Sequence, residues 1–377
     1  MIMNEEHRLL AETAREFLAA KSPVAALRRL RDTRDALGYD PALWAEIVGL
    51  GWTAMVLSEE HGGLDFGYRG LGSVFESIGR NLAATPLLST VVLGGGLLHD
   101  AGSEAQRAHW LPRVVDGSAL FALALDEGPR HDPAAVRTSA RQVDGGWVLD
   151  GEKWFVLDGH IADRLLVVAR SAGAAGDARG LSLFLVDPAS PGVARTRTWM
   201  VDSRNAARVT LSQVRVDAED LIGPAHEGAG VLEATLDRAR VCLAAEALGV
   251  VGEAFDRTVA YLKERVQFDV PIGSFQALQH RAARLYVEIE LLRSCVAAAL
   301  DALDHDSAQA PLLASLAKAR AADLSERALN EAVQLHGGVG VTDALDIGLF
   351  LKRGRALQQT FGDAVYHRDR WARLSGF

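Results

Sequence analysis

The stretch YLKERVQFDVPIGSFQALQH, residues 261–280, decides how this chain is organised, because it joins two helical patterns through a sharp break. Apolar residues at helical spacing lead into it from the N-terminal side. Pro271 disfavours helix for the residue before it, so the first helix cannot continue. Ser274 is predicted to be the N-cap of the next helix. The stretch therefore predicts an exposed helix-to-helix corner.

The side chains at this corner suit a flat ligand that carries phosphate. Arg265 can bind phosphate oxygens with two parallel hydrogen bonds, and Phe268 can pack on rings. The amides of Gln267 and Gln276, the latter in the first turn of the next helix, can donate further hydrogen bonds. A plain helix corner with a surface arginine is the alternative that composition alone supports.

Length and composition describe a globular chain. Its 377 residues suffice for two or three domains, with 49% hydrophobic and 24% charged residues. The formal net charge of −9 argues against nonspecific nucleic-acid binding. Cys242 and Cys295 lie in apolar helical patterns and are expected to be reduced thiols. A polar N-terminus and no run of about 18 apolar residues predict a cytoplasmic protein without a membrane span.

The periodic patterns divide the chain into three parts and predict an α+β fold. Residues 1–118 predict helices, residues 119–226 predict short strands, and residues 227–377 predict a four-helix bundle. The strands, in a small barrel or sandwich, are expected at 121–125, 147–150, 154–157, 165–169, 181–186 and 209–216. The bundle helices are expected near 228–264, 275–304, 309–335 and 344–371.

The pattern R-x-Q-F-x-x-P-I-x-x-F-Q-x-x-Q-H at 265–280 closely resembles the signature of the acyl-CoA dehydrogenase family. Other phrases that resemble the family follow its order: EEHGG (59–63), DGGWVLDGEKWFVLDG (144–159), LIGPAHEGAG (221–230) and QLHGGVGVT (334–342). The resemblance covers nearly the whole chain. It implies an N-terminal α-helical domain, a middle β domain and a C-terminal four-helix bundle.

The resemblance also implies a function. Family members are FAD flavoproteins of fatty acid metabolism that oxidise an acyl-CoA thioester to its trans-2-enoyl form and pass electrons to an electron-transfer flavoprotein-like acceptor. The corner would reach the FAD diphosphate across a subunit interface. The residues that the resemblance assigns to FAD are Arg265, Gln267, Phe268, Gln276, Gln334, Gly338 and Phe155. By itself, the glycine turn after residue 336 would indicate only a helix C-cap.

The glutamate base of the family is missing at both of its usual places. By resemblance, one place falls at Phe361 and the other at Ala239, next to Arg240. Asp363 and Asp237 are the remaining carboxylates that could serve as the base, and Asp363 could also be a helix-start residue. No H-E-x-x-H, paired Cys/His or G-x-S-x-G spacing is present, which argues against a metal site and against hydrolase chemistry.

The side that would face the flavin also departs from the family. Leu125 and His131 replace a threonine and a serine, and Leu157 replaces a hydroxyl residue near flavin N5. One interpretation is a homodimer or homotetramer that holds its own FAD. A second is an incomplete subunit that completes the FAD site of a homologous partner in an α2β2 heterotetramer, as in the pimeloyl-CoA dehydrogenase small-subunit type that the chain resembles. A third is a flavin-free scaffold.

Overall fold

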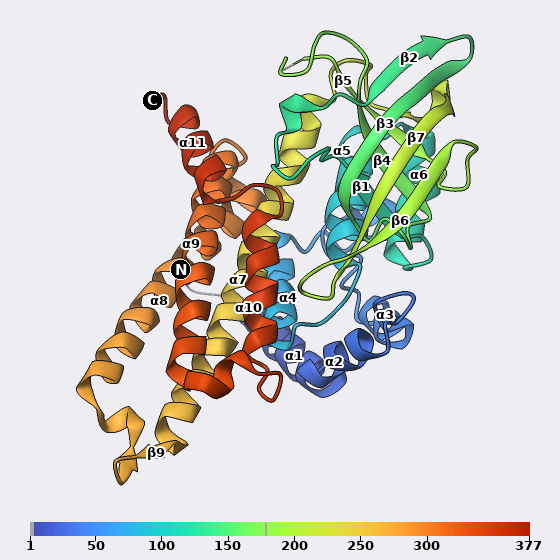
Figure 1. Ribbon diagram of the computed structural model, residues 1–377. Helices are drawn as coiled ribbons and strands as arrows, with labels where there is room; N and C mark the ends of the chain where they lie inside the picture. The colour runs from blue at the N-terminus through green and yellow to red at the C-terminus, as the bar shows by residue number, and fades with distance from the viewer. Residues whose placement is uncertain (1–3, 178) are drawn as a thin grey trace. The chain divides into compact units, whose positions relative to one another are not determined.

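The computed structural model describes residues 4–177 and 179–377, and its elements follow the order helices, strands, helices (Figure 1). The first helices are α1 (Glu5–Lys21), α2 (Val24–Asp32), α3 (Pro41–Gly49), α4 (Tyr68–Asn81), a π-helix (Leu88–Gly95), α5 (Gly96–Ala101) and α6 (Glu104–Val115). The strands are β1 (Phe121–Ala124), β2 (Ser139–Val143), β3 (Gly146–Leu157), β4 (Arg164–Arg170), β5 (Leu181–Val186), β6 (Val193–Trp199), β7 (Asn205–Asp217) and β8 (Leu221–Ile222). After them come α7 (Ala229–Glu264), β9 (Val266–Gln267), β10 (Val270–Pro271), α8 (Gln276–His305), α9 (Ala310–His336), α10 (Ile347–Gln359) and α11 (Ala364–Leu374).

Two compact units make up the described chain. One contains the residues up to Thr33, Tyr68–Ala84 and Arg240–Phe377, so it combines N-terminal helices with most of the C-terminal helices. The other contains Arg34–Gly67 and Thr85–Ala239, and it holds the large sheet. The predicted α+β class with a helical first part, a sheet in the middle and a helical last part is confirmed.

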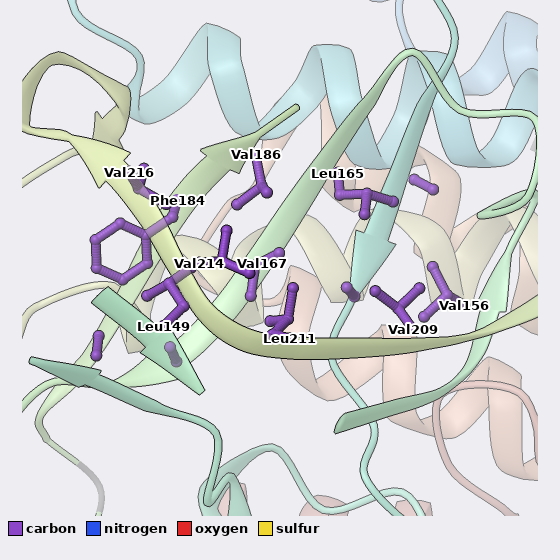
Figure 2. Close-up of a cluster of buried hydrophobic side chains, with 14 of the residues drawn as sticks. Leu149, Val156, Leu165, Val167, Phe184, Val186, Val209, Leu211, Val214 and Val216 are labelled. Carbon is purple, nitrogen blue, oxygen red and sulfur yellow. The ribbon is translucent and has the colours of Figure 1, made fainter. Parts of the chain in front are cut away.

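The large sheet has the strand order β6-β7-β3-β2-β4-β5-β8, and β1 also pairs with β4. It is a mixed sheet, since β1 and β2 run parallel to β4 whereas the other pairs are antiparallel. Alternate residues of β1, β4, β5 and β7 and of the first part of β3 enter one apolar cluster, in keeping with the two-residue period of a strand (Figure 2). That cluster includes Leu149, Val156, Leu165, Val167, Phe184, Val186, Val209, Leu211, Val214 and Val216.

Two bulges interrupt the pairing of β3 with β7. At the first, β7 carries an extra residue, and Gln213 has φ +51° while its N–H donates to the Asp150 carboxylate over 2.8 Å. At the second, β3 carries the extra residue between Lys153 and Val156. Phe155 sits at this bulge with φ +51°, a rare conformation for a large side chain, and 42% of it is exposed.

The long helices of the other unit pack through small residues. Helix α9 packs on α8, α10 and α11, and α4 packs on α1 and α8. Two glycines let α4 and α7 approach backbone to backbone. A Cβ on Gly79 would lie 2.0 Å from the Glu246 carbonyl oxygen, and a Cβ on Gly249 would lie 1.9 Å from that of Glu76. Only glycine fits at these two positions.

Several predicted boundaries are wrong, each for a local reason. The expected strands 147–150 and 154–157 are one strand, β3, because the bulge at Phe155 bends the ladder without ending it. Strands β2 and β6 were not predicted, since their largely polar patterns lack an apolar run, and β8 was not predicted because it has only two residues, Leu221 and Ile222. The expected helix 344–371 is two helices, α10 and α11, because Phe361 and Gly362 have φ values of +55° and +110°.

Ser274 does not cap α8. It ends a short 3₁₀ turn, Ile272–Ser274, and its hydroxyl donates to the Pro271 carbonyl oxygen over 2.8 Å. Phe275 occupies the N-cap position without a side-chain hydrogen bond. The hydroxyl is therefore used inside the turn and does not serve the helix that follows.

Cys242 is buried and Cys295 is half-buried, and both are free thiols. Within residues 4–177 and 179–377, no helix combines the length and the apolar character that a membrane crossing needs. Among the same residues, no group of three or more His, Cys, Asp or Glu side chains is placed to hold a metal ion.

The close approach of α4 and α7 predicts that Gly249→Ala lowers the free energy of unfolding by about 1–3 kcal/mol, because the added methyl group collides with a backbone carbonyl. Gly230→Ala, on the same helix with open space at the Cβ position, is expected to raise it by up to about 1 kcal/mol. Urea unfolding of both variants measures the difference. Equal stabilities of the two variants would contradict the backbone contact.

Candidate functional site

A β-hairpin forms the corner that sequence analysis expected between the two helices. Strands β9 and β10 pair through Val270 with Gln267 and Pro271 with Val266, between the end of α7 and the start of α8 (Figure 1). The two residues that link them, Phe268 and Asp269, have φ values of +54° and +63°. Positive φ at both central residues is the requirement of a tight hairpin turn of type I′. Sequence reasoning missed it because neither residue is a glycine.

Arg265 lies at the base of this hairpin. Its backbone N–H donates to the Tyr261 carbonyl oxygen over 2.8 Å, and its own carbonyl oxygen accepts the Ile272 N–H over 2.8 Å. The backbone of Arg265 is thus fixed on both sides. Its guanidinium makes no hydrogen bond or ion pair with another described residue, so a charged group is held in place and left available.

The glycine turn after α9 forms the second wall. Gly337 has φ +65°, and a Cβ at Gly337 or Gly338 would meet no atom within 4 Å, so the backbone there is open to a ligand. The His336 ring stacks on Tyr261 with 4.4 Å between ring centroids, and its Nδ1 donates to the Ala332 carbonyl oxygen over 2.8 Å. This contact links the end of α9 to the end of α7.

These two walls enclose a cavity of about 620 Å³. Its lining residues are Tyr261, Arg265, Gln267, Ile272, Leu278, Arg281, Gln334, Leu335, His336, Gly337, Gly338, Val339 and Leu345. Four residues that sequence analysis assigned to one site therefore line one cavity: Arg265, Gln267, Gln334 and Gly338.

Two predicted residues lie outside the lining. Phe268 stands at the hairpin tip with 88% of its side chain exposed, and its ring contacts Phe275 edge to face. Gln276 is the first residue of α8 and is exposed. The face of α8 that lines the cavity carries Leu278 and Arg281, and position 276 points about 200° away from position 278 around a helix.

Arg281 is a second cation of the cavity that sequence analysis did not single out. It forms an ion pair with Glu331, and this hydrogen bond raises the pKa of Arg281 further. Tyr261 and His336 were also missed. For Arg281 the available signal was helical spacing, because a residue three positions after Leu278 lies on the same face of the helix. For Tyr261 and His336 no local signal exists, because their rings come together only in the folded chain.

The loop between α10 and α11, where sequence analysis expected the family's glutamate position, holds Phe361 in a buried, left-handed conformation. The side chain is 6% exposed and φ is +55°. Two side chains hold its carbonyl oxygen: Arg240 Nε donates over 3.2 Å and His367 Nε2 donates over 3.0 Å. Burial, together with Lys318 and Arg240, lowers the pKa of His367 to about 2, so this imidazole is neutral.

Lys318 holds the same loop from α9. Its Nζ donates to the carbonyl oxygens of Leu357, Gln358 and Gly362 over 2.9, 3.3 and 2.8 Å. These carbonyls end α10, where a cation also compensates the helix dipole. Burial and the Arg240 charge lower the pKa of Lys318 to about 7.

The two candidate carboxylates occupy different surroundings. Asp363 is the N-cap of α11, where its carboxylate accepts the Tyr366 N–H over 2.8 Å. Asp237 lies on α7 and is 3% exposed. Asp363 thus has the structural role that sequence analysis offered as its alternative.

The residues expected to face the flavin belong to the sheet unit. Phe155 projects from the β3 bulge, Leu125 is buried after β1, and Leu157 is half-buried at the end of β3. His131 does not replace the missing hydroxyl as a free donor, because its Nδ1 pairs with the Asp126 carboxylate over 2.9 Å.

Lys318→Met is expected to lower the free energy of unfolding by about 2–4 kcal/mol at pH 7, because three buried carbonyls lose their donor. An unfolded lysine titrates near pH 10.4 and the folded Lys318 near 7, so between these values the unfolded chain binds more protons. The stability of the wild type relative to this variant should therefore rise by about 1–3 kcal/mol from pH 7 to 9.

Denaturant unfolding at several pH values measures this effect. Lys352→Met, which removes an exposed lysine of α10, is the control and should change the free energy of unfolding little at any pH. A stability difference for Lys318→Met that stays constant between pH 7 and 9 would show that Lys318 does not titrate in this window.

Known proteins resemble the chain over nearly its full length. Three family domains match it: acyl-CoA dehydrogenase N-terminal domain at residues 4–118, middle domain at 122–215 and C-terminal domain at 226–375. The acyl-CoA dehydrogenase FadE12 of Mycobacterium tuberculosis is 33% identical over 320 residues, which cover 83% of this chain and 82% of that protein.

Solved structures agree with these matches. A variant of the Tcur3481–Tcur3483 steroid ACAD is 34% identical with a TM-score of 0.87 and covers 98% of both chains. The ChsE4–ChsE5 complex from Mycobacterium tuberculosis is 27% identical with a TM-score of 0.89 and covers 100% of this chain and 99% of that one. The chain therefore belongs to the acyl-CoA dehydrogenase family.

Proposed function

We propose that this chain is a FAD-dependent acyl-CoA dehydrogenase-type protein that acts in the α,β-dehydrogenation of an acyl-CoA thioester. One observation carries the proposal: Arg265, Gln267, Gln334 and the open glycine backbone at 337–338 line the same cavity. The family membership of the chain supports an oxidoreductase that acts on a CH–CH bond.

The cavity fits a diphosphate by its charge and its donors. Arg265 offers a guanidinium without a carboxylate partner, and Arg281 adds a second one whose charge is balanced by Glu331. Amide donors come from Gln267 and Gln334, and Gly338 leaves room for close approach of ligand oxygens to the backbone. Arginine forks and backbone N–H groups are the usual partners of phosphate oxygens in proteins.

The chemistry divides between cofactor and protein. FAD, when bound, supplies the acceptor for the hydride that leaves the β-carbon of the acyl chain. The protein must remove a proton from the α-carbon, which requires a carboxylate of raised pKa near that carbon. Phe361 cannot accept a proton, and Ala239 cannot either.

We infer further that a homologous partner supplies the base, and that this chain completes the partner's FAD site in a heterotetramer. Three features support this: the apolar side chain at 361, the leucines at 125 and 157, and the intact cavity at Arg265. Two of the similar solved structures are named as pairs of proteins, Tcur3481–Tcur3483 and ChsE4–ChsE5. An electron-transfer flavoprotein-like acceptor would reoxidise the flavin.

A self-sufficient homo-oligomer is the second candidate, favoured by the burial of Asp237. Asp237 is only 3% exposed, so its carboxylate is shielded from bulk water. In that case Asp237 or Asp363 would be the base, and the chain would hold its own flavin against Phe155. A flavin-free scaffold has no structural feature in its favour.

Arg265→Gln is expected to weaken FAD binding about tenfold, because one charge-assisted contact to phosphate is lost. The measurement is the flavin-to-protein ratio from visible absorbance, for the chain purified alone and co-expressed with a homologue that carries the glutamate. Arg284→Gln is the matched control, since Arg284 is an exposed arginine of α8 outside the cavity. Equal flavin content in both variants and the wild type would show that the cavity is not part of the FAD site.

The source of the base is tested with the chain alone. If a partner supplies it, the purified chain should not be bleached by an acyl-CoA, while the co-expressed pair should be. A yellow chain that is bleached alone would overturn the partner proposal. Asp237→Asn and Asp363→Asn would then identify the base, since only the catalytic change should lower kcat by at least about a hundredfold while FAD stays bound.

A further inference from the structure

One connection between two helices forms a whole wall of the cavity that Arg265 lines, called the Arg265 cavity below. This connection, residues 337–346, joins α9 to α10, and four of its residues line the cavity: Gly337, Gly338, Val339 and Leu345. Its first half is the 3₁₀ helix Gly337–Val341. Its second half, residues 343–346, consists of turns and a bend, so contacts from other elements decide where it lies.

Helix α2 holds this second half through two arginines. Arg28 Nε donates to the Asp346 carboxylate over 2.7 Å, and its Nη2 donates to the Leu345 carbonyl oxygen over 3.1 Å. Both Nη atoms of Arg31 donate to the Asp343 carboxylate over 2.8 Å, which makes a bidentate pair. The hydrogen bonds from Arg31 hold the pKa of Asp343 well below its usual value. The two arginines therefore contact three residues of the wall, and one of these, Leu345, lines the cavity.

Asp346 also joins the wall to α7. Its carboxylate accepts Arg257 Nη1 over 2.8 Å, and Arg257 Nε donates to Glu253 of the same helix over 2.9 Å. Asp346 occupies the N-cap position of α10, where an aspartate usually accepts an N–H group of the first turn. Within the described chain its side chain makes no such cap. The carboxylate is used to hold the wall in place of capping the helix.

Isolated ion pairs at a protein surface contribute little, but this set has the features that make such pairs count. Arg28 has 21% of its side chain exposed and Asp346 has 26%, so water screens this pair less than an exposed one. The pairs also share carboxylates and form one chain: Arg31, Asp343, Arg28, Asp346 and Arg257. All five residues belong to the same compact unit. The network thus fixes a segment that has little regular structure of its own.

We infer that Arg28 and Arg31 are positioning residues of the Arg265 cavity, because from α2 they fix residues 343–346 and with them the cavity wall. Neither arginine lines the cavity, so both act through the carboxylates that they hold. A wall that is already fixed costs less free energy to order when a ligand enters. The identity of that ligand, the diphosphate of FAD, rests on the proposed function, whereas the contacts of the arginines with the wall do not.

The test compares Arg28→Gln with Arg29→Gln, and each variant loses one positive charge. Arg29 is an exposed arginine of the same helix, and its position is turned by about 100° around the helix axis from that of Arg28. Isothermal titration calorimetry of the full chain measures the affinity for FAD and for inorganic pyrophosphate. Amide hydrogen exchange of residues 337–346 without ligand reports on the wall itself. Exchange in the middle of α9 reports whether the fold is intact.

Arg28→Gln should speed the exchange of residues 337–346 about tenfold and weaken the binding of both probes about fivefold, while the middle of α9 exchanges as in the wild type. Arg29→Gln should change none of these. Asp346→Asn should also weaken binding, and the loss in Arg28→Gln/Asp346→Asn should be smaller than the product of the two single losses, because both substitutions break the same linkage.

Unchanged exchange of the wall in Arg28→Gln, or an equal change in Arg29→Gln, would overturn the inference. Faster exchange of the wall at unchanged affinity for both probes would overturn it as well, because Arg28 would then stabilise the connection without positioning the cavity. A wild-type chain that binds neither probe would contradict the proposed function of the cavity. In that case the exchange of residues 337–346 still decides whether Arg28 holds the wall.

Discussion

The stacking of Tyr261 on His336 is the contact on which the candidate site depends. Helix α7 ends three residues after Tyr261, and α9 ends at His336, so this one ring pair holds two helix ends together. The imidazole is fixed in turn by its hydrogen bond to Ala332. With the helix ends in place, the hairpin carries Arg265 to one wall of the cavity and the turn carries the open backbone of Gly338 to the other. Rigid helices thus position a site whose ligand-facing groups all lie just beyond them.

The sequence grouped several residues that the structure also brings together, because they come from short motifs. An arginine, two glutamines and an aromatic ring within one corner favoured a phosphate-bearing ligand, and Arg265 and Gln267 line one cavity with Gln334 and Gly338, whereas the phosphate ligand itself stays a prediction. The local backbone conformations of these segments were not predicted. A hairpin turn made by Phe268 and Asp269 carries no glycine signal, and the left-handed backbone of Phe361 is imposed by Arg240, His367 and the tertiary packing around them. Such conformations are stabilised by partners far along the chain, which a local pattern does not contain.

The loop at residues 360–363 connects α10 with α11 and is held by side chains from several helices. Side chains of α7, α9 and α11 converge on its carbonyl oxygens, and two of these side chains, Lys318 and His367, have their pKa values lowered because they are buried among cations. Burial of so many basic groups is costly unless every donor meets an acceptor. The backbone of the loop meets that requirement without any contribution from the side chain at position 361. The loop can therefore keep its shape whether that position carries a carboxylate or a phenyl ring.

This independence bears on the proposal that a homologous partner supplies the base. The loop is held by backbone acceptors, and the Arg265 cavity is built by the ends of α7 and α9 with the start of α8, so neither set of contacts involves the Phe361 side chain as a donor or acceptor. A phenyl ring at position 361 cannot accept a proton, yet the contacts that hold the loop and line the cavity do not need a carboxylate there. Under the proposed function, the chain would therefore keep its fold and its Arg265 cavity without a base of its own at this position.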